Sequence, residues 1–219
     1  MCIIAVKPVG VDLPNKSVLK NMFSNNPDGA GFAYPRAGRV EIEKGFMSQK
    51  EFISALKDIQ ADTKSIPVII HCRIATSGEV SSANTHPFPV SSDIKHLQAL
   101  HVRAPLAVAH NGIIPVKVEP KYLSDTMVFI RDLLAPLQTL KHDFYKTDAG
   151  RRIAKSAAQS KLAFLDGHGR VELIGDFKTG ADGVLYSNSS YKHEFEDVLA
   201  KYMKRPYLNE YWTEDYTHY

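Results

Sequence analysis

The order of strand-like and helix-like segments constrains the fold of this chain most strongly. Short apolar runs rich in β-branched residues, typical of strands covered on both faces, alternate unevenly with segments of helical periodicity. The regular strand–helix–strand alternation of a doubly wound or barrel fold is missing. The sequence therefore predicts an α+β fold in which two mixed or antiparallel sheets are flanked by helices. The predicted strands are residues 2–8, 32–34, 40–44, 66–72, 106–110, 162–165, 171–174 and 183–186.

The predicted helices carry recognisable start and stop signals. Asn15 is expected to cap the first helix, because its side chain can accept a hydrogen bond from the first turn. Ser48 and Glu51 match a capping box at the start of the second helix. Pro136 is expected to kink the third helix or end it early, because proline lacks a backbone N–H. The predicted helices are residues 15–23, 48–59, 126–140, 148–158 and a segment from His193 onward.

Length, charge and cysteine content indicate one soluble domain. The chain has 219 residues, enough for a substantial core, and no repeat or linker, so we expect a single domain over residues 1–219. A net charge of +3 is too small to indicate nucleic-acid or membrane binding. No apolar run approaches the roughly 20 residues that span a bilayer, and no signal peptide is visible. Two cysteines cannot form a disulfide framework, so a cytoplasmic location is expected.

Cys2 directly follows the initiator methionine and leads into an apolar run. Removal of Met1 would leave a thiol and a free α-amine on the same residue. An α-amine titrates at roughly 7.7–8.0, which suits a general base acting on the thiol. The alternative is that Cys2 is only a small apolar residue at the start of a buried strand. Its position alone does not decide between these two readings.

Arg73 ends a buried apolar run, and strand ends are places where a rigid scaffold presents functional groups. With Thr76 and Ser77 following it, Arg73 could hold a carboxylate through two parallel hydrogen bonds. The alternative is an arginine that reaches solvent at a strand end. The sequence therefore offers a carboxylate-binding site here without requiring one.

Two further polar stretches occupy similar places. Asn111 and Gly112 follow the strand over 106–110 and offer a side-chain amide beside an unhindered backbone N–H, as an oxyanion hole requires. Asn-Gly is also a very common turn. Asp125 could bind a substrate ammonium group, or it could cap the following helix together with Ser124.

The histidines and the second cysteine give no motif of their own. The sequence has no HxH or HExxH pattern and no carboxylate at ligand spacing, so no metal site is expected. His71 and Cys72 are adjacent, but neighbouring strand residues face opposite sides of a sheet. A Cys/His pair acting together is therefore not expected, and Cys72 is predicted to lie in the core.

Taken together and in order, these stretches resemble the class II glutamine amidotransferases, whose domain belongs to the N-terminal-nucleophile (Ntn) hydrolases. The resemblance covers residues 2–126, and more loosely the last predicted strand. The matching stretches are Met1-Cys2, Asp28-Gly29-Ala30-Gly31-Phe32-Ala33, His71-Cys72-Arg73-Ile74-Ala75-Thr76-Ser77-Gly78-Glu79, Asn84-Thr85-His86-Pro87-Phe88, Ala109-His110-Asn111-Gly112 and Ser124-Asp125-Thr126.

The resemblance implies a four-layer αββα sandwich of the Ntn-hydrolase type and hydrolysis of the side-chain amide of glutamine. It implies that the Cys2 thiol attacks this amide with the help of its own α-amine. It also implies that the Asn111 side chain and the Gly112 N–H stabilise the oxyanion. The products are a γ-glutamyl thioester and ammonia, and water then regenerates the thiol.

The resemblance also implies how the substrate, glutamine or another γ-glutamyl amide, is held. Arg73 is expected to bind the α-carboxylate, Asp125 the α-ammonium, and Thr76 and Ser77 lie on the expected substrate loop. No metal or organic cofactor is implied. The chain carries no synthase partner domain, so ammonia is expected to pass to a separate acceptor protein or simply to be released.

Two other functions stay open. Ile3 stands where the family usually has glycine, and an aromatic C-terminal segment, 202–219, has a composition suited to docking a partner. These features fit a catalytically silent Ntn-fold module that binds a partner. A weaker alternative is an Ntn amidohydrolase that acts on another amide, which the pair of Arg73 and Asp125 disfavours.

Overall fold

The computed structural model describes residues 2–59, 64–76 and 78–192. The strands are β1 (Ile3–Lys7), β2 (Ala30–Arg36), β3 (Arg39–Phe46), β4 (Val68–Cys72), β5 (Phe88–Pro89), β6 (His101–Ala104), β7 (Leu106–Asn111), β8 (Lys161–Asp166), β9 (Val171–Ile174), β10 (Lys178–Thr179) and β11 (Leu185–Tyr186). The α-helices are α1 (Lys16–Asn25), α2 (Gln49–Asp58), α3 (Ile94–Gln98), α4 (Asp125–Phe129), α5 (Ala135–Leu140) and α6 (Asp148–Ala158). Shorter elements include the 3-10 helices η2 (Ser82–Asn84) and η4 (Phe144–Lys146) and a π-helical turn, η3 (Ile130–Leu134).

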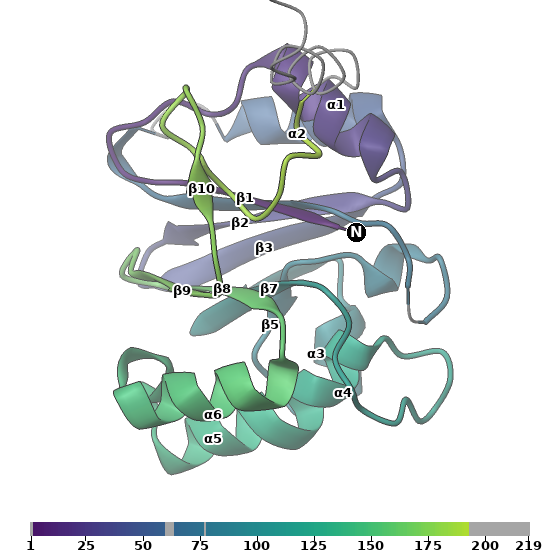
Figure 1. Cartoon of the computed structure of the whole chain (residues 1–219), viewed down its shortest axis with the longest axis vertical. Coiled ribbons are helices and arrows are strands. Elements are labelled where there is room, and N and C mark those ends of the chain that lie inside the picture. Colours follow the sequence, from purple (N-terminus) through teal and green to yellow (C-terminus); the bar gives the residue numbers. More distant parts are fainter. Residues whose placement is uncertain (1, 60–63, 77, 193–219) are drawn as a thin grey trace, which may run out of the picture.

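The strands form two antiparallel sheets that lie face to face (Figure 1). One has seven strands in the order β10-β11-β1-β4-β2-β3-β6, and the other has four in the order β5-β7-β8-β9. The neighbouring strands described in both sheets pair antiparallel. The predicted α+β class is confirmed, and of the two sheet types considered, the antiparallel one is observed.

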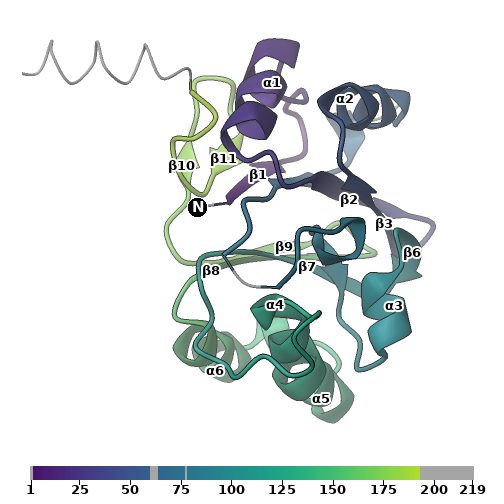
Figure 2. The same cartoon turned by 90° about the vertical axis from the view of Figure 1, so that its right-hand side faces the viewer.

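Three apolar cores separate the layers. Ile4 and Val6 of β1 face the other sheet and pack in the core between the two sheets. Ile3 and Ala5 point the opposite way, toward α1 and α2, because successive strand residues face opposite sides. The third core packs α4, α5 and α6 against β7 and β8. The described chain therefore has four layers, with helices outside two sheets (Figures 1 and 2).

The two predicted helix caps have different outcomes. Asn15 caps α1 as predicted, since its Oδ1 accepts a hydrogen bond from the Val18 N–H at 3.0 Å. Ser48 stands at the start of α2 but makes no side-chain capping bond, so the predicted capping box is wrong. Buried Phe52 and its neighbours hold α2 on the sheet. Each such buried side chain contributes about 1.5–3 kcal/mol, more than the ~1 kcal/mol typical of a cap.

Pro136 does not end the predicted third helix. The segment continues from α4 through η3 into α5 and ends at Leu140. Just before Pro136, the Ala135 N–H donates to the Ile130 carbonyl in a π-helical pattern. Pro136 lies in the first turn of α5, where a missing N–H is tolerated. The π-helical turn thus allows the helical segment to continue past Pro136.

Sequence patterns did not predict the short elements α3, β5 and β6. They have five residues or fewer, too few for a periodic signal. The predicted helix from His193 and the predicted docking segment 202–219 lie outside the described residues. Within the described ranges, no helix combines the length and apolar character needed to cross a bilayer.

Candidate active site

Cys2 and Arg73 are neighbours because β1 and β4 pair antiparallel. The register places Ile3 opposite Cys72, so the residue before β1 meets the residue after β4. The end of β7, in the other sheet, reaches the same place. There His71 Nε2 lies 3.0 Å from the His110 carbonyl oxygen. Ends of strands from both sheets therefore surround one point.

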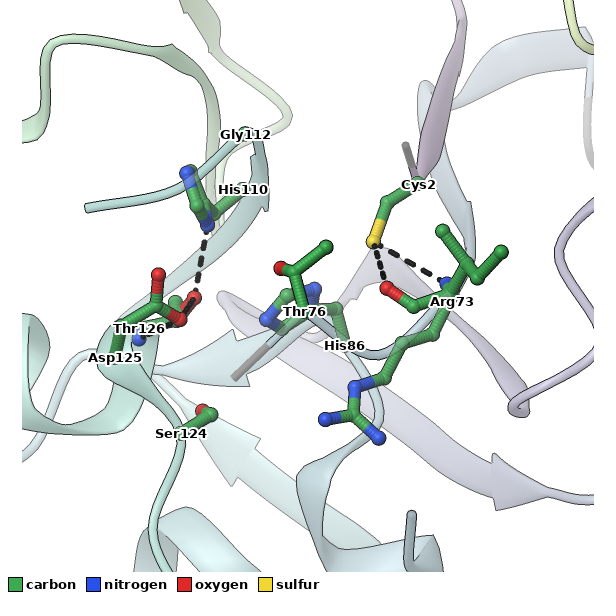
Figure 3. Close-up of a pocket in the computed structure, with 10 residues that line it drawn as sticks. Cys2, Arg73, Thr76, His86, His110, Gly112, Ser124, Asp125 and Thr126 are labelled. Atoms are coloured by element: carbon green, nitrogen blue, oxygen red, sulfur yellow. Dashed lines mark hydrogen bonds between the residues drawn. The ribbon is translucent and has the colours of Figure 1, made fainter. Parts of the chain in front are cut away.

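A small cavity lies at this point (Figure 3). Its lining residues are Cys2, Arg73, Ile74, Thr76, His86, His110, Gly112, Ser124, Asp125 and Thr126. The structure thus brings together five of the sequence-predicted site residues. Ser77 lies outside the described residues, and Asn111 lies beside the cavity rather than on its wall. The cavity volume is about 10 Å³, room for about one water molecule.

The Cys2 thiol is held against the loop that follows β4. Its Sγ lies 3.3 Å from the Ile74 carbonyl oxygen and 3.4 Å from the Ile74 nitrogen. Asn188 Nδ2 donates to the Cys2 carbonyl at 2.7 Å. Burial raises the pKa of the Cys2 thiol, although the Ile74 hydrogen bond and the Arg73 charge oppose this shift. The thiol form therefore dominates at neutral pH, and reaction as a nucleophile requires a base.

Ile3, which follows Cys2, does not line this cavity. Its side chain is fully buried in the core beneath α1 and α2, on the opposite side of β1. Cys72 lies in the same core, as predicted, and burial raises the pKa of its thiol. Cys72 is therefore a core residue, and Ile3 does not crowd Cys2.

Arg73 is almost completely buried, with 3% of its surface exposed. Its side-chain Nη1 donates to the Glu79 carbonyl at 3.1 Å, and its backbone N–H donates to the Gly29 carbonyl at 2.8 Å. Asp28 Oδ2 accepts a hydrogen bond from the Ala75 N–H at 2.7 Å and fixes the start of the loop. Burial lowers the pKa of Arg73, whereas the Cys2 thiol and the carboxylates of Asp28 and Asp125 act in the opposite direction. The loop thus holds a buried cation beside the thiol.

Asp125 and Ser124 have separate tasks at the start of α4. Ser124 Oγ accepts a hydrogen bond from the Met127 N–H at 3.2 Å and caps the helix. Asp125 points into the cavity and is 6% exposed (Figure 3). Its two oxygens accept hydrogen bonds from the N–H groups of Ile114 and Thr126, both at 2.8 Å. A buried carboxylate therefore lies in the same cavity as the Arg73 cation.

Asn111 ends β7 and Gly112 follows it, but only Gly112 lines the cavity. Gly112 lines the cavity with φ of 147°, and a Cβ there would lie 2.5 Å from Ser160 Cβ. Only glycine fits this position without strain. The Asn111 amide donates to Ser187 Oγ at 2.8 Å, while its Oδ1 is buried without a partner in the described part of the chain.

Three buried histidines, His71, His86 and His110, form a cluster beside the cavity. His86 Nδ1 lies 2.9 Å from His71 Nε2, which also contacts the His110 carbonyl. His110 contacts Thr126 Oγ1 through Nδ1 at 2.9 Å and Ser160 Oγ through Nε2 at 2.8 Å. Burial lowers the pKa of His71 to about 3 and that of His110 to about 4. The cluster is therefore neutral at pH 7, and it connects β4, β7 and α4.

Sequence reasoning set aside the histidine cluster and did not identify Asp28, Ser187 or Asn188 as supporting residues. Their contacts join positions far apart in the chain, such as Asn188 and Cys2, and no spacing rule reveals them. Among residues 2–59, 64–76 and 78–192, no group of histidine, cysteine and acidic side chains suits a metal ion. Comparison of the chain with models of protein families gave no match, and comparison with curated proteins gave none.

Proposed function

We propose that this chain is an amidohydrolase of the class II glutamine amidotransferase type, with the Ntn-hydrolase fold. The observation that carries the proposal is the single cavity shared by the Cys2 thiol, the Arg73 guanidinium and the Asp125 carboxylate. A free amino acid has one anionic and one cationic group, and the two buried charges match them. The four-layer arrangement and its antiparallel sheets support the same family.

The first half-reaction forms a thioester on Cys2. Removal of Met1 frees the Cys2 α-amine, which takes the thiol proton because burial disfavours spontaneous ionisation. Sγ attacks the amide carbon of glutamine, and the Gly112 N–H stabilises the oxyanion. Loss of one such donor typically costs about 2.7–4 kcal/mol of barrier. The C–N bond then breaks, the nitrogen takes the proton, and ammonia leaves.

Asn111 supplies the second donor to the oxyanion in this scheme. An amide nitrogen carries two N–H groups, and Ser187 accepts only one of them. The Ser187 hydroxyl also accepts from the Ile4 N–H at 2.9 Å, so its position is fixed by β1. Ser187 therefore orients the Asn111 amide, whose second N–H serves the intermediate.

The second half-reaction hydrolyses the γ-glutamyl thioester. Water attacks the thioester carbon, the α-amine accepts its proton, and glutamate leaves as the thiol is restored. Glutamine needs more room than the cavity of about 10 Å³ provides, so residues that line the cavity must move to admit it. Ammonia passes to a separate acceptor protein or into solution. No step requires a metal or an organic cofactor.

A glutaminase assay tests this proposal. The purified protein is incubated with glutamine, glutamate and ammonia are measured, and intact mass shows whether Met1 is removed. We expect turnover by the wild type and by Cys72→Ala, whose thiol lies in the core, and none by Cys2→Ala. Equal turnover by wild type and Cys2→Ala contradicts the proposal.

A second candidate function is a catalytically silent Ntn-fold module that binds a partner. The observation that favours it is the small cavity, which holds about one water molecule. A diazo-ketone analogue of glutamine separates the two functions. Stoichiometric labelling of Cys2 by this analogue supports the enzyme, whereas an unlabelled Cys2 in protein lacking Met1 supports the silent module.

A further inference from the structure

We infer that His86 is a further substrate-binding residue, whose Nε2–H donates a hydrogen bond to the α-carboxylate of the substrate. The inference rests on the proposed function, because it assumes that an amino acid binds between Arg73 and Asp125. His86 follows η2 in the chain and lines the cavity. Figure 3 draws its ring behind Thr76, between Asp125 and the Arg73 side chain.

The first supporting observation is an unpartnered nitrogen on a buried ring. His86 is 4% exposed, and its Nε2 has no hydrogen-bond partner among the described residues. Leaving a buried polar group unsatisfied costs stability, so most buried polar groups in proteins have a hydrogen-bond partner. His71 Nδ1 is also unpartnered, but His71 does not line the cavity. The ligand site therefore explains the nitrogen of His86 only.

The second observation fixes where the proton of His86 lies. The His110 carbonyl oxygen can only accept, so the His71 Nε2 that lies 3.0 Å from it must carry a hydrogen. The same nitrogen lies 2.9 Å from His86 Nδ1, which must then be the bare, accepting nitrogen. A neutral His86 consequently carries its hydrogen on Nε2. Its unpartnered nitrogen is a donor.

The His86 imidazole stays neutral, so it carries one hydrogen only, on Nε2. Burial lowers the pKa of His86 well below its ordinary value, and the charges of Arg73 and Lys44 lower it further. His86 is also held in place by its neighbours, with ring centroids 4.2 Å from His71 and 4.7 Å from Phe88, both edge-on. The donor thus has a fixed direction and carries no charge.

A neutral donor selects one group of the substrate. It cannot pair with the α-ammonium group, which also only donates and which Asp125 balances. The amide oxygen becomes the oxyanion that faces Gly112. The α-carboxylate is the remaining acceptor, and its oxygens offer more lone pairs than Arg73 alone uses. His86 therefore adds specificity for a free carboxylate.

Two substitutions at His86 separate the substrate contact from the internal contact. In His86→Asn, the amide reaches about as far as Nδ1, so it keeps an acceptor for His71 but loses the outer donor. In His86→Gln, the amide reaches about as far as Nε2 and keeps a donor for the substrate. Both are made together with Cys2→Ala, so that glutamine binding is measured by calorimetry without turnover.

Binding of glutamine is compared with binding of 4-aminobutanamide, which is glutamine without its α-carboxylate. We expect His86→Asn to weaken glutamine binding roughly 10- to 100-fold, as for a hydrogen bond to a charged group, and to leave 4-aminobutanamide binding unchanged. We expect His86→Gln to bind glutamine within a few-fold of the parent. Thermal melting confirms that each variant is folded.

Equal loss for both ligands, or a larger loss in His86→Gln than in His86→Asn, would show a purely structural role and overturn the inference. An absence of glutamine binding in Cys2→Ala overturns it as well. The glutaminase assay on the wild type tests the proposed function separately, because it measures turnover and not binding. Binding that depends on His86 without any turnover would reject the enzyme and retain the ligand contact.

Discussion

Mild acid should destabilise this protein, because the histidine cluster is neutral in the folded state. Burial lowers the pKa of His71 to about 3 and of His110 to about 4, and that of His86 well below its ordinary value. In the unfolded chain each of these side chains titrates at roughly 6.5. Below that pH the unfolded state binds more protons than the folded state. The free energy of unfolding therefore falls as the pH falls from about 6.5 toward 4.

The size of the effect follows from the unfolded pKa alone. At pH 5 an unfolded histidine is protonated while a buried one is still neutral. At about 1.36 kcal/mol per pH unit over 1.5 units, each histidine lowers stability by about 2 kcal/mol. Three independent histidines lower it by about 6 kcal/mol between pH 7 and 5. Domains of this kind are stable by about 5–15 kcal/mol, so the loss is a large fraction of the total.

Urea unfolding at pH 7, 6 and 5 measures this loss by linear extrapolation. Asp132 and Asp166 do not obscure it, because their lowered pKa values place the loss of their stabilisation below pH 4. In His110→Gln the difference between pH 7 and 5 should shrink by about 2 kcal/mol. His142→Gln, at an exposed histidine, should leave it unchanged. A total loss below about 2 kcal/mol would refute the picture of a neutral buried cluster.

Three further predictions concern the cavity. Gly112→Ala should lose about 1–3 kcal/mol of stability through both a positive φ and a close contact, whereas Gly38→Ala, with open space around it, should lose less; equal losses in urea unfolding would exclude the close contact. In protein that retains Met1, the rate of Cys2 alkylation by iodoacetamide, followed by mass spectrometry, should still increase above pH 9 because the pKa of the thiol is raised, while Cys72 stays unmodified. A rate that stops increasing at pH 8 contradicts this. Asp125→Asn should weaken glutamine binding at least ~10-fold in calorimetry, and unchanged affinity would remove Asp125 from the ligand site.

Local patterns predicted much of the secondary structure. The helix predicted over 148–158 is α6 with the same bounds, and the strand predicted over 171–174 is β9. The periodicity of such an element and the turns that bound it depend on residues close in sequence, so local patterns predict them. Ser48 shows the opposite case. A capping motif has the right residues there, but packing of α2 on the sheet sets its start without the side-chain bond.

The candidate site, too, was predicted in part from the sequence and in part became visible only in the structure. Sequence reasoning identified Cys2, Arg73, Gly112 and Asp125 one at a time, each with an ordinary structural alternative. The structure places all four on one cavity, and the burial of Arg73 excludes the alternative of an arginine that reaches solvent. At the start of α4, Ser124 caps the helix, which is one of the possibilities that the sequence left open, and Asp125 lines the cavity.

The sequence alone determined which residues alternate, which form turns and which are candidates for chemistry, because these properties depend on neighbours within a few positions. Only the tertiary structure decided which of them meet. The pairing of β1 with β4 puts Cys2 beside Arg73, and the two stacked sheets put His71 against the carbonyl of His110. Such contacts depend on register and on the packing of layers, and no local pattern encodes either. For the same reason the unpartnered nitrogen of His86, a residue that lines the cavity, is visible only in the fold.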